Sequence, residues 1–108
     1  KRIECVIKKW GHRFIERVFC PGEIELCQSM RKSSVCFAAR FAVKEAFSKA
    51  LGTGIRKLSW KDIEVAHKKS GKPYLIIRGK SKELLGNRSS DVSISDTDNL
   101  ATAIVIIE

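Results

Sequence analysis

The feature that most constrains the fold is the run VCFAARFAVKEAFSKAL, from Val35 to Leu51. It is rich in alanine and apolar almost all round, which predicts a helix covered by protein on most of its sides. Ser34 is the expected N-cap, and Gly52 follows the run as helix ends favour. The rest of the chain is therefore expected to pack around one central helix.

The N-terminal segment carries an amphipathic pattern. Apolar side chains recur at three- and four-residue steps, which predicts one helix from Lys1 to Val18, weakened near its middle by Gly11. Arg2, Arg13 and Arg17 fall within one sector of its opposite, basic side. Taken alone, such a stripe is more often a solvated face than a docking surface.

The remaining elements are short. A helix is expected from Pro21 to Met30 and a helical turn from Ser81 to Leu85. Two-residue alternation predicts strands at 63–67, 74–78, 91–95 and 101–107, the first two joined by a hairpin turn at 69–73. The expected fold class is α+β, an antiparallel sheet packed on the long central helix, in a single domain spanning residues 1–108.

Charge and cysteine content narrow the functional classes. The chain has 21 Lys and Arg against 12 Asp and Glu, a net charge of +9, which favours an acidic partner or a phosphorylated ligand. With 44% apolar and 31% charged residues, a disordered chain and a membrane span are both disfavoured. The four cysteines form no CxxC pair, so free thiols in a cytoplasmic protein are expected rather than zinc ligands or disulfides.

Two charged residues of the central run are candidates for chemistry. Glu45 and Lys49 lie four residues apart and share a helix face. The structural interpretation is a surface ion pair that contributes only a few tenths of a kcal/mol. The functional one is a Mg²⁺ site, since Mg²⁺ takes one or two carboxylates and completes its shell with water and phosphate oxygens. The residues alone leave both open, and the turn at Gly52 to Gly54 is either an anion-binding backbone or simply a helix stop.

Four ordered blocks, FAARFAVKEAFSKALGTGI, LSWKDIEV, SGKPYLII and VSISDT before a final strand, resemble the holo-acyl-carrier-protein synthases of the phosphopantetheinyl transferase superfamily. The resemblance is collinear over nearly the whole chain. It implies Mg²⁺-dependent transfer of the 4′-phosphopantetheine arm of coenzyme A to a serine of an apo acyl carrier protein. The reaction releases adenosine 3′,5′-bisphosphate and serves fatty acid biosynthesis.

The resemblance also implies roles for individual residues. Glu45 is the expected Mg²⁺ ligand, and Lys49 is expected to lie against the coenzyme A phosphates. The serine proton goes either to Glu45 or to a metal-bound water that Glu45 orients. Further candidates for the coenzyme A pocket are Arg40, Gly52, Gly54 and Ser95, with the turn at 71–74 near the adenine.

Partners follow from the same resemblance. Carrier proteins of this type are acidic, so Arg2, Arg13 and Arg17 are the expected docking surface. Family members assemble as trimers with the site between subunits, and the apolar strand Ala101–Ile107 is compatible with such an interface. A nucleic-acid partner is not expected.

Two departures from the family pattern stand out. A GIGxDI strand, whose aspartate is the second Mg²⁺ ligand, normally precedes the residues that match Lys1 to Ile3, so the native protein is expected to have a further N-terminal strand. Asp96 stands where the family commonly has the histidine of an SxSH motif.

Two other functions compete with the transferase. A basic α+β nucleic-acid-binding module would explain the charge, but Tyr74 is the one aromatic residue in the predicted strands. A non-catalytic scaffold that binds carrier protein is the other alternative. It is suggested by the lack of the GIGxDI strand in this sequence and by Asp96 at the position of the family histidine.

Overall fold

Helix α4 (Ser33–Leu51) is the centre of the computed structural model, which describes residues 11–52, 59–97 and 100–108. Ala39, Val43 and Phe47 on its inner face are completely buried. The helix ends at Gly52, whose φ of 86° is a left-handed conformation that suits glycine. The predicted central helix is confirmed, but it starts two residues early, at Ser33 with Lys32 at the N-cap, so the expectation of a cap at Ser34 is wrong.

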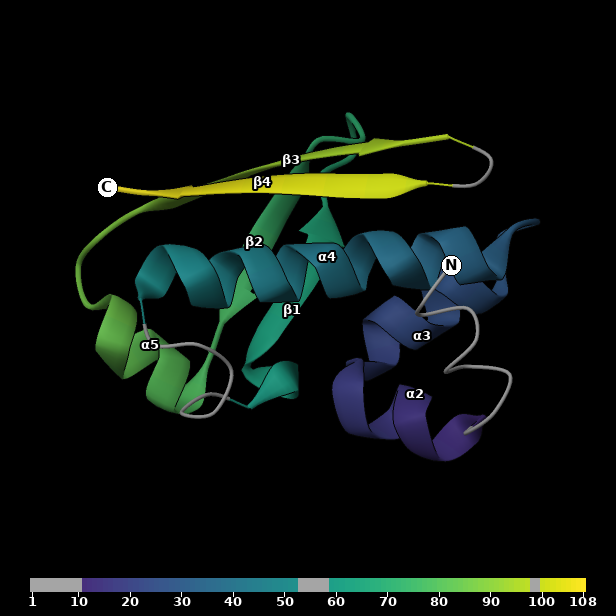
Figure 1. The fold of residues 1–108 in the computed structure, drawn as a ribbon, viewed down its shortest axis with the longest axis horizontal. Coiled ribbons are helices and arrows are strands. Elements are labelled where there is room, and N and C mark those ends of the chain that lie inside the picture. The colour runs from purple at the N-terminus through teal and green to yellow at the C-terminus, as the bar shows by residue number, and fades with distance from the viewer. Residues whose placement is uncertain (1–10, 53–58, 98–99) are drawn as a thin grey trace.

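Two short helices, α2 (His12–Val18) and α3 (Pro21–Gln28), pack beside the N-terminal part of α4 (Figure 1). Their apolar side chains form one cluster with α4, built from Ile15, Val18, Phe19, Cys27, Cys36 and Phe37. Helix α2 begins directly after Gly11, whose φ of 59° is not helical. The prediction of one helix running through this position is therefore wrong, and its first ten residues lie outside the described ranges.

The strands form two antiparallel pairs, β1 (Ile63–His67) with β2 (Pro73–Ile77) and β3 (Ser90–Asp96) with β4 (Ala101–Ile107). The 3₁₀ turn η2 (Trp60–Asp62) precedes β1, and helix α5 (Gly79–Leu85) follows β2. In Figure 1, β3 and β4 run along α4, while β1 and β2 cross behind it. The predicted α+β class, with antiparallel strands packed on the central helix, is confirmed.

The core lies where α4 meets both strand pairs. Val43 of α4 packs with Val65 of β1 and Val92 of β3, and Phe47 packs with Ile63 and Leu85. Along β1 and β4 the less exposed residues occupy every second position, which explains the two-residue alternation in the sequence. No helix within the described ranges is both long and apolar enough to cross a membrane.

A charged pair is enclosed in this core. The Lys44 ammonium lies 2.9 Å from the Glu23 carboxylate, and both side chains are fully shielded from solvent. Glu23 is near the start of α3 and Lys44 is in the middle of α4, so the pair joins two helices. Buried charges are found where they are paired and hydrogen-bonded, as these are.

A disulfide provides a second connection between the same two helices. Cys27 of α3 and Cys36 of α4 are bonded, with 5.3 Å between their Cα atoms. The expectation of free thiols is therefore wrong for this pair, whereas Cys20 is a free, buried thiol. The helix packing brings the two cysteines together, which their spacing in the sequence does not reveal.

Candidate active site

Glu45 and Lys49 project from one face of α4, as predicted. Glu45 is half-buried and Lys49 is exposed. No ion pair joins the two side chains, although both lie in the described part of the chain. The surface ion pair that would make them merely structural is therefore absent from the structure, and both charges are available to a ligand.

The C-terminal end of α4 lies directly after Lys49, and Gly52 caps it. The Gly52 amide donates to the carbonyls of Ser48 and Lys49, at 3.2 and 3.0 Å, so this N–H is used in ending the helix. Gly54, the other predicted glycine of the pocket, lies outside the described residues. The Ser48 hydroxyl donates to the Glu45 carbonyl at 2.8 Å, which keeps that hydroxyl within the last turn.

Arg40 occupies a different environment on the same helix. Only 7% of it is exposed, and its Nη2 atom lies 3.3–3.4 Å from the two ring nitrogens of His67, at the end of β1. Its Nε atom is buried without a hydrogen-bond partner. Burial lowers the pKa of Arg40, while Glu23 and Asp96 act in the opposite direction. The guanidinium is thus partly desolvated and incompletely satisfied, which suits a site for an anion.

Ser95 and Asp96 end strand β3. Ser95 is exposed, and its carbonyl accepts a hydrogen bond from the Thr102 hydroxyl at 3.3 Å. Asp96 is close enough to Arg40 to favour its charged form. Arg40 therefore lies near the C-terminal end of β3.

The structure does not bring all the predicted residues together. At 100° per residue, Arg40 and Glu45 point about 140° apart around α4, and Gly52 lies about 18 Å from Arg40 along the axis. One set contains Glu45, Lys49 and Gly52, and the other contains Arg40 and Ser95. The predicted site residues thus fall into two groups, termed half-sites below, on different sides of the central helix.

The donor set fits a magnesium ion that shares its shell with a ligand. In the described ranges, no three His, Cys, Asp or Glu side chains converge into a metal cluster. Glu45 offers one half-buried carboxylate beside a lysine. Because Mg²⁺ commonly takes one or two carboxylates and draws its other ligands from water and phosphate, Glu45 fits that role.

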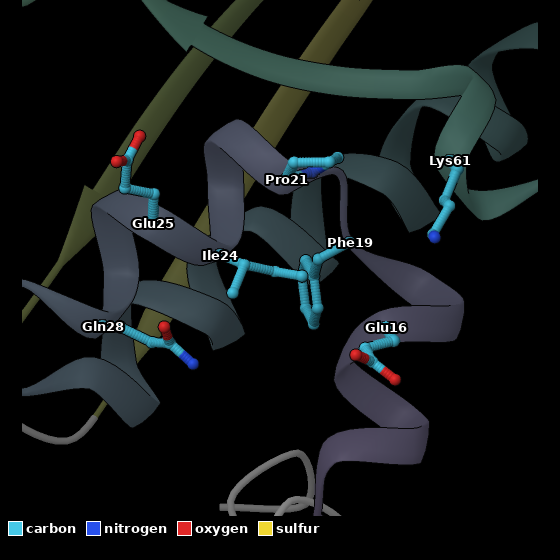
Figure 2. A pocket seen from close by; sticks show the side chains of 7 residues that line it. All are labelled: Glu16, Phe19, Pro21, Ile24, Glu25, Gln28 and Lys61. Atoms are coloured by element: carbon cyan, nitrogen blue, oxygen red, sulfur yellow. The ribbon is translucent and has the colours of Figure 1, made fainter.

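A pocket of about 630 Å³ opens between α2, α3 and η2, away from all of these residues. Figure 2 shows apolar side chains at its floor and charged ones around it; the lining residues are Glu16, Phe19, Pro21, Ile24, Glu25, Gln28 and Lys61. The predicted docking residues Arg13 and Arg17 are exposed on the neighbouring helix α2, and Arg2 lies outside the described residues.

Sequence reasoning missed three residues that lie near the predicted ones: Glu23 and Lys44, which form the buried pair, and His67, which contacts Arg40. A signal existed for Lys44, because it lies three residues before the buried Phe47 and hence on the inner face of the helix. Glu23 sits at the third helical position after Cys20, where a carboxylate can cap the preceding turn. Nothing in the sequence pairs His67 with Arg40.

Comparisons with known proteins cover nearly the whole chain. Residues 1–105 match the model of the 4′-phosphopantetheinyl transferase superfamily. A holo-[acyl-carrier-protein] synthase of Koribacter versatilis is 42% identical over 111 residues, which is 99% of this chain and 89% of that protein.

Solved structures agree with the sequence comparison. The holo-[acyl-carrier-protein] synthase of Helicobacter pylori, in complex with coenzyme A, superimposes with a TM-score of 0.85 at 34% identity, covering 99% of this chain and 91% of that one. The synthase of Bacillus anthracis, in complex with coenzyme A (3′,5′-ADP), gives a TM-score of 0.81 at 35% identity, covering 99% and 86%.

Proposed function

Because this chain belongs to the 4′-phosphopantetheinyl transferase superfamily, we propose that it moves the 4′-phosphopantetheine arm of coenzyme A onto a serine of an apo acyl carrier protein. The observation that carries the proposal is the near-complete match to holo-[acyl-carrier-protein] synthases, with Glu45 and Lys49 displayed unpaired on one face of α4. The other product is adenosine 3′,5′-bisphosphate. We place the reaction in the cytoplasm, in fatty acid biosynthesis.

Glu45 is proposed to hold Mg²⁺ together with the substrate diphosphate. When bound, Mg²⁺ would neutralise charge on the diphosphate as the serine oxygen attacks and the nucleotide departs. Glu45 suits this task because it is half-buried, which strengthens its attraction to a cation relative to a fully solvated carboxylate. It is also one of two candidates to receive the serine proton, the other being a water that it orients.

Lys49 lies one turn after Glu45 and is exposed, so its ammonium is free to approach the phosphates from the same side. Lysine supplies a compact point charge with three donors, which suits oxygens that change position during the transfer. We propose that Lys49 keeps the diphosphate in place beside Glu45.

The two half-sites are best explained by a homotrimer. We propose that Glu45 and Lys49 of one subunit act on the same coenzyme A as Arg40 and Ser95 of its neighbour. A surface able to bury such an interface exists on the outer face of β4, where Ile104 and Ile106 are 63% and 55% exposed. Large apolar side chains exposed side by side commonly mark an interaction site.

The acidic carrier protein is proposed to dock on α2. Arg13 and Arg17 lie one turn apart and are both exposed, and Arg2 is the third residue of the proposed surface. The pocket between α2 and α3 lies beside them and has an apolar floor, so it offers room for an apolar side chain of the partner. A net charge of +9 would speed the encounter with an acidic protein.

The nucleotide product gives a direct test. The protein is incubated with coenzyme A, Mg²⁺ and an apo acyl carrier protein, and the nucleotides are separated by liquid chromatography. We expect adenosine 3′,5′-bisphosphate to form only when carrier protein and Mg²⁺ are both present. Absence of this product, with the carrier protein still bound, would favour the non-catalytic scaffold, and binding of nucleic acid instead would favour the basic module.

A further inference from the structure

We propose that Lys44 and Glu23 are positioning residues, which set the rotation of helix α4 and thereby the direction of the Glu45 carboxylate. The inference rests on the proposed role of Glu45 as a Mg²⁺ ligand. It concerns two buried side chains that do not themselves touch substrate or metal.

Three fixed oxygen atoms surround the Lys44 ammonium. It donates to the carbonyl of Trp60 at 3.0 Å and to the carbonyl of Ile63, and it forms an ion pair with the Glu23 carboxylate at 2.9 Å. Two of these partners are backbone carbonyls, one in η2 and one at the first residue of β1, and the Lys44 side chain is fully shielded from solvent. The middle of α4 is therefore attached to the strand by directional bonds.

Glu23 is held as firmly. Its Oε1 atom accepts from the Cys20 amide and its Oε2 atom from the Val65 amide, both at 2.9 Å. The first bond fixes the carboxylate to the start of α3, and the second fixes it to β1. The pair thus joins α3, α4 and β1 at a single point, with both side chains completely buried.

Apolar packing alone would hold α4 less exactly in rotation, because hydrophobic contacts are not directional. Glu45 follows Lys44 directly in the helix. A rotation of about 15° would move a group about 5–6 Å from the helix axis by about 1.5 Å. Misplacement of a catalytic group by about 1 Å can cost about a hundredfold in rate. By fixing the rotation of α4, the buried pair fixes where the Glu45 carboxylate lies.

The double variant Glu23→Met/Lys44→Met separates positioning from stability, because it replaces the pair by apolar side chains and leaves no unpaired charge. Buried ion pairs replaced in this way often keep or gain stability. Binding of Mn²⁺, as a substitute for Mg²⁺, is measured in the presence of coenzyme A by electron paramagnetic resonance of the free ion. We expect the double variant to bind Mn²⁺ about 10–100-fold more weakly, the range that follows the loss of a group that orients a metal ligand.

Matched controls accompany this measurement. Arg78 and Glu64 form an exposed pair at 2.7 Å, and Glu64→Met/Arg78→Met should leave the Mn²⁺ affinity unchanged. Glu45→Gln should abolish binding; unchanged binding in that variant would overturn the metal site itself. Loss of binding with Glu45→Gln but wild-type affinity in the double variant would overturn the positioning role alone.

A gentler change guards against a double variant that does not fold. Glu23→Asp keeps both charges and shortens the carboxylate by one methylene, so it tests geometry without removing the pair. We expect Glu23→Asp to weaken Mn²⁺ binding by about threefold to tenfold, less than removal of the whole pair. Wild-type affinity in Glu23→Asp would contradict the positioning role.

Discussion

Arg40 and His67 form a contact between two groups that can both be cationic. A neutral imidazole can accept a hydrogen bond from the guanidinium through one of its ring nitrogens, which lie 3.3–3.4 Å from Nη2. Partial burial, and then the Arg40 charge, lower the pKa of His67 below its ordinary value. Protonation of His67 would both remove this hydrogen bond and place a second cation beside Arg40.

This contact predicts a pH-dependent stability. In the unfolded chain His67 takes up its proton near pH 6.5, but in the folded chain it does so only at lower pH, so acidification favours unfolding. We expect urea denaturation to give a smaller unfolding free energy at about pH 5.5 than at about pH 7.5. The decrease should be smaller in His67→Gln. An equal decrease in both proteins would show that His67 does not contribute.

Single residues also show where sequence reasoning succeeds. Glu45 and Lys49 were placed on one helix face because helical spacing alone determines that relation. The surroundings of Arg40 and Lys44 depend on segments that lie at least sixteen positions further along the chain. No local pattern encodes such partners, so the sequence predicts neither the histidine beside Arg40 nor the carbonyls that hold Lys44.

Helices and strands followed their patterns closely. Strands β1 and β4 have the predicted bounds, and β2 and β3 differ from them by one residue at each end. The predictions failed at helix ends and at a helix interruption. Gly11 interrupts the first predicted helix with a positive φ, and α4 begins before its expected cap. A glycine within an apolar pattern can either continue a helix or end it, and the decision rests on tertiary packing.

The buried pair that connects α3 and α4 predicts that removing one of its charges destabilises the fold more than removing both. Lys44→Met alone should destabilise the fold by about 3–5 kcal/mol, because it leaves the Glu23 carboxylate buried without its counterion. Glu23→Met/Lys44→Met should cost much less than the single change. Chemical denaturation of both variants checks this, and a double variant no more stable than Lys44→Met would contradict it.

Helix α2 carries the prediction for carrier-protein docking. Arg13→Glu/Arg17→Glu should raise KM for the apo acyl carrier protein by about tenfold or more and leave KM for coenzyme A nearly unchanged, since only the protein partner meets this surface. Steady-state kinetics at low salt give both constants. Lys80→Glu/Lys82→Glu on α5 makes the same change in net charge at another exposed site. If both double variants raise KM equally, overall charge rather than α2 determines docking.

At the level of the whole molecule, two half-sites on one chain predict that active sites are shared between subunits. Glu45→Gln and Arg40→Met should each be inactive alone. When the two are co-expressed and mix at random in a trimer, about one site in four combines an intact Glu45 with an intact Arg40. We expect activity to return to about a quarter of the wild-type value per site. No recovery in verified mixed trimers would place both residues in one subunit's site.

The central claim is that this chain transfers phosphopantetheine with the help of Glu45. The most direct test is the intact mass of an apo acyl carrier protein after incubation with coenzyme A and Mg²⁺, with wild-type protein and with Glu45→Gln. We predict that wild-type protein adds the mass of one phosphopantetheine group to the acceptor serine, and that Glu45→Gln is slower by at least about a hundredfold. An unchanged carrier-protein mass with the wild-type protein would contradict the account.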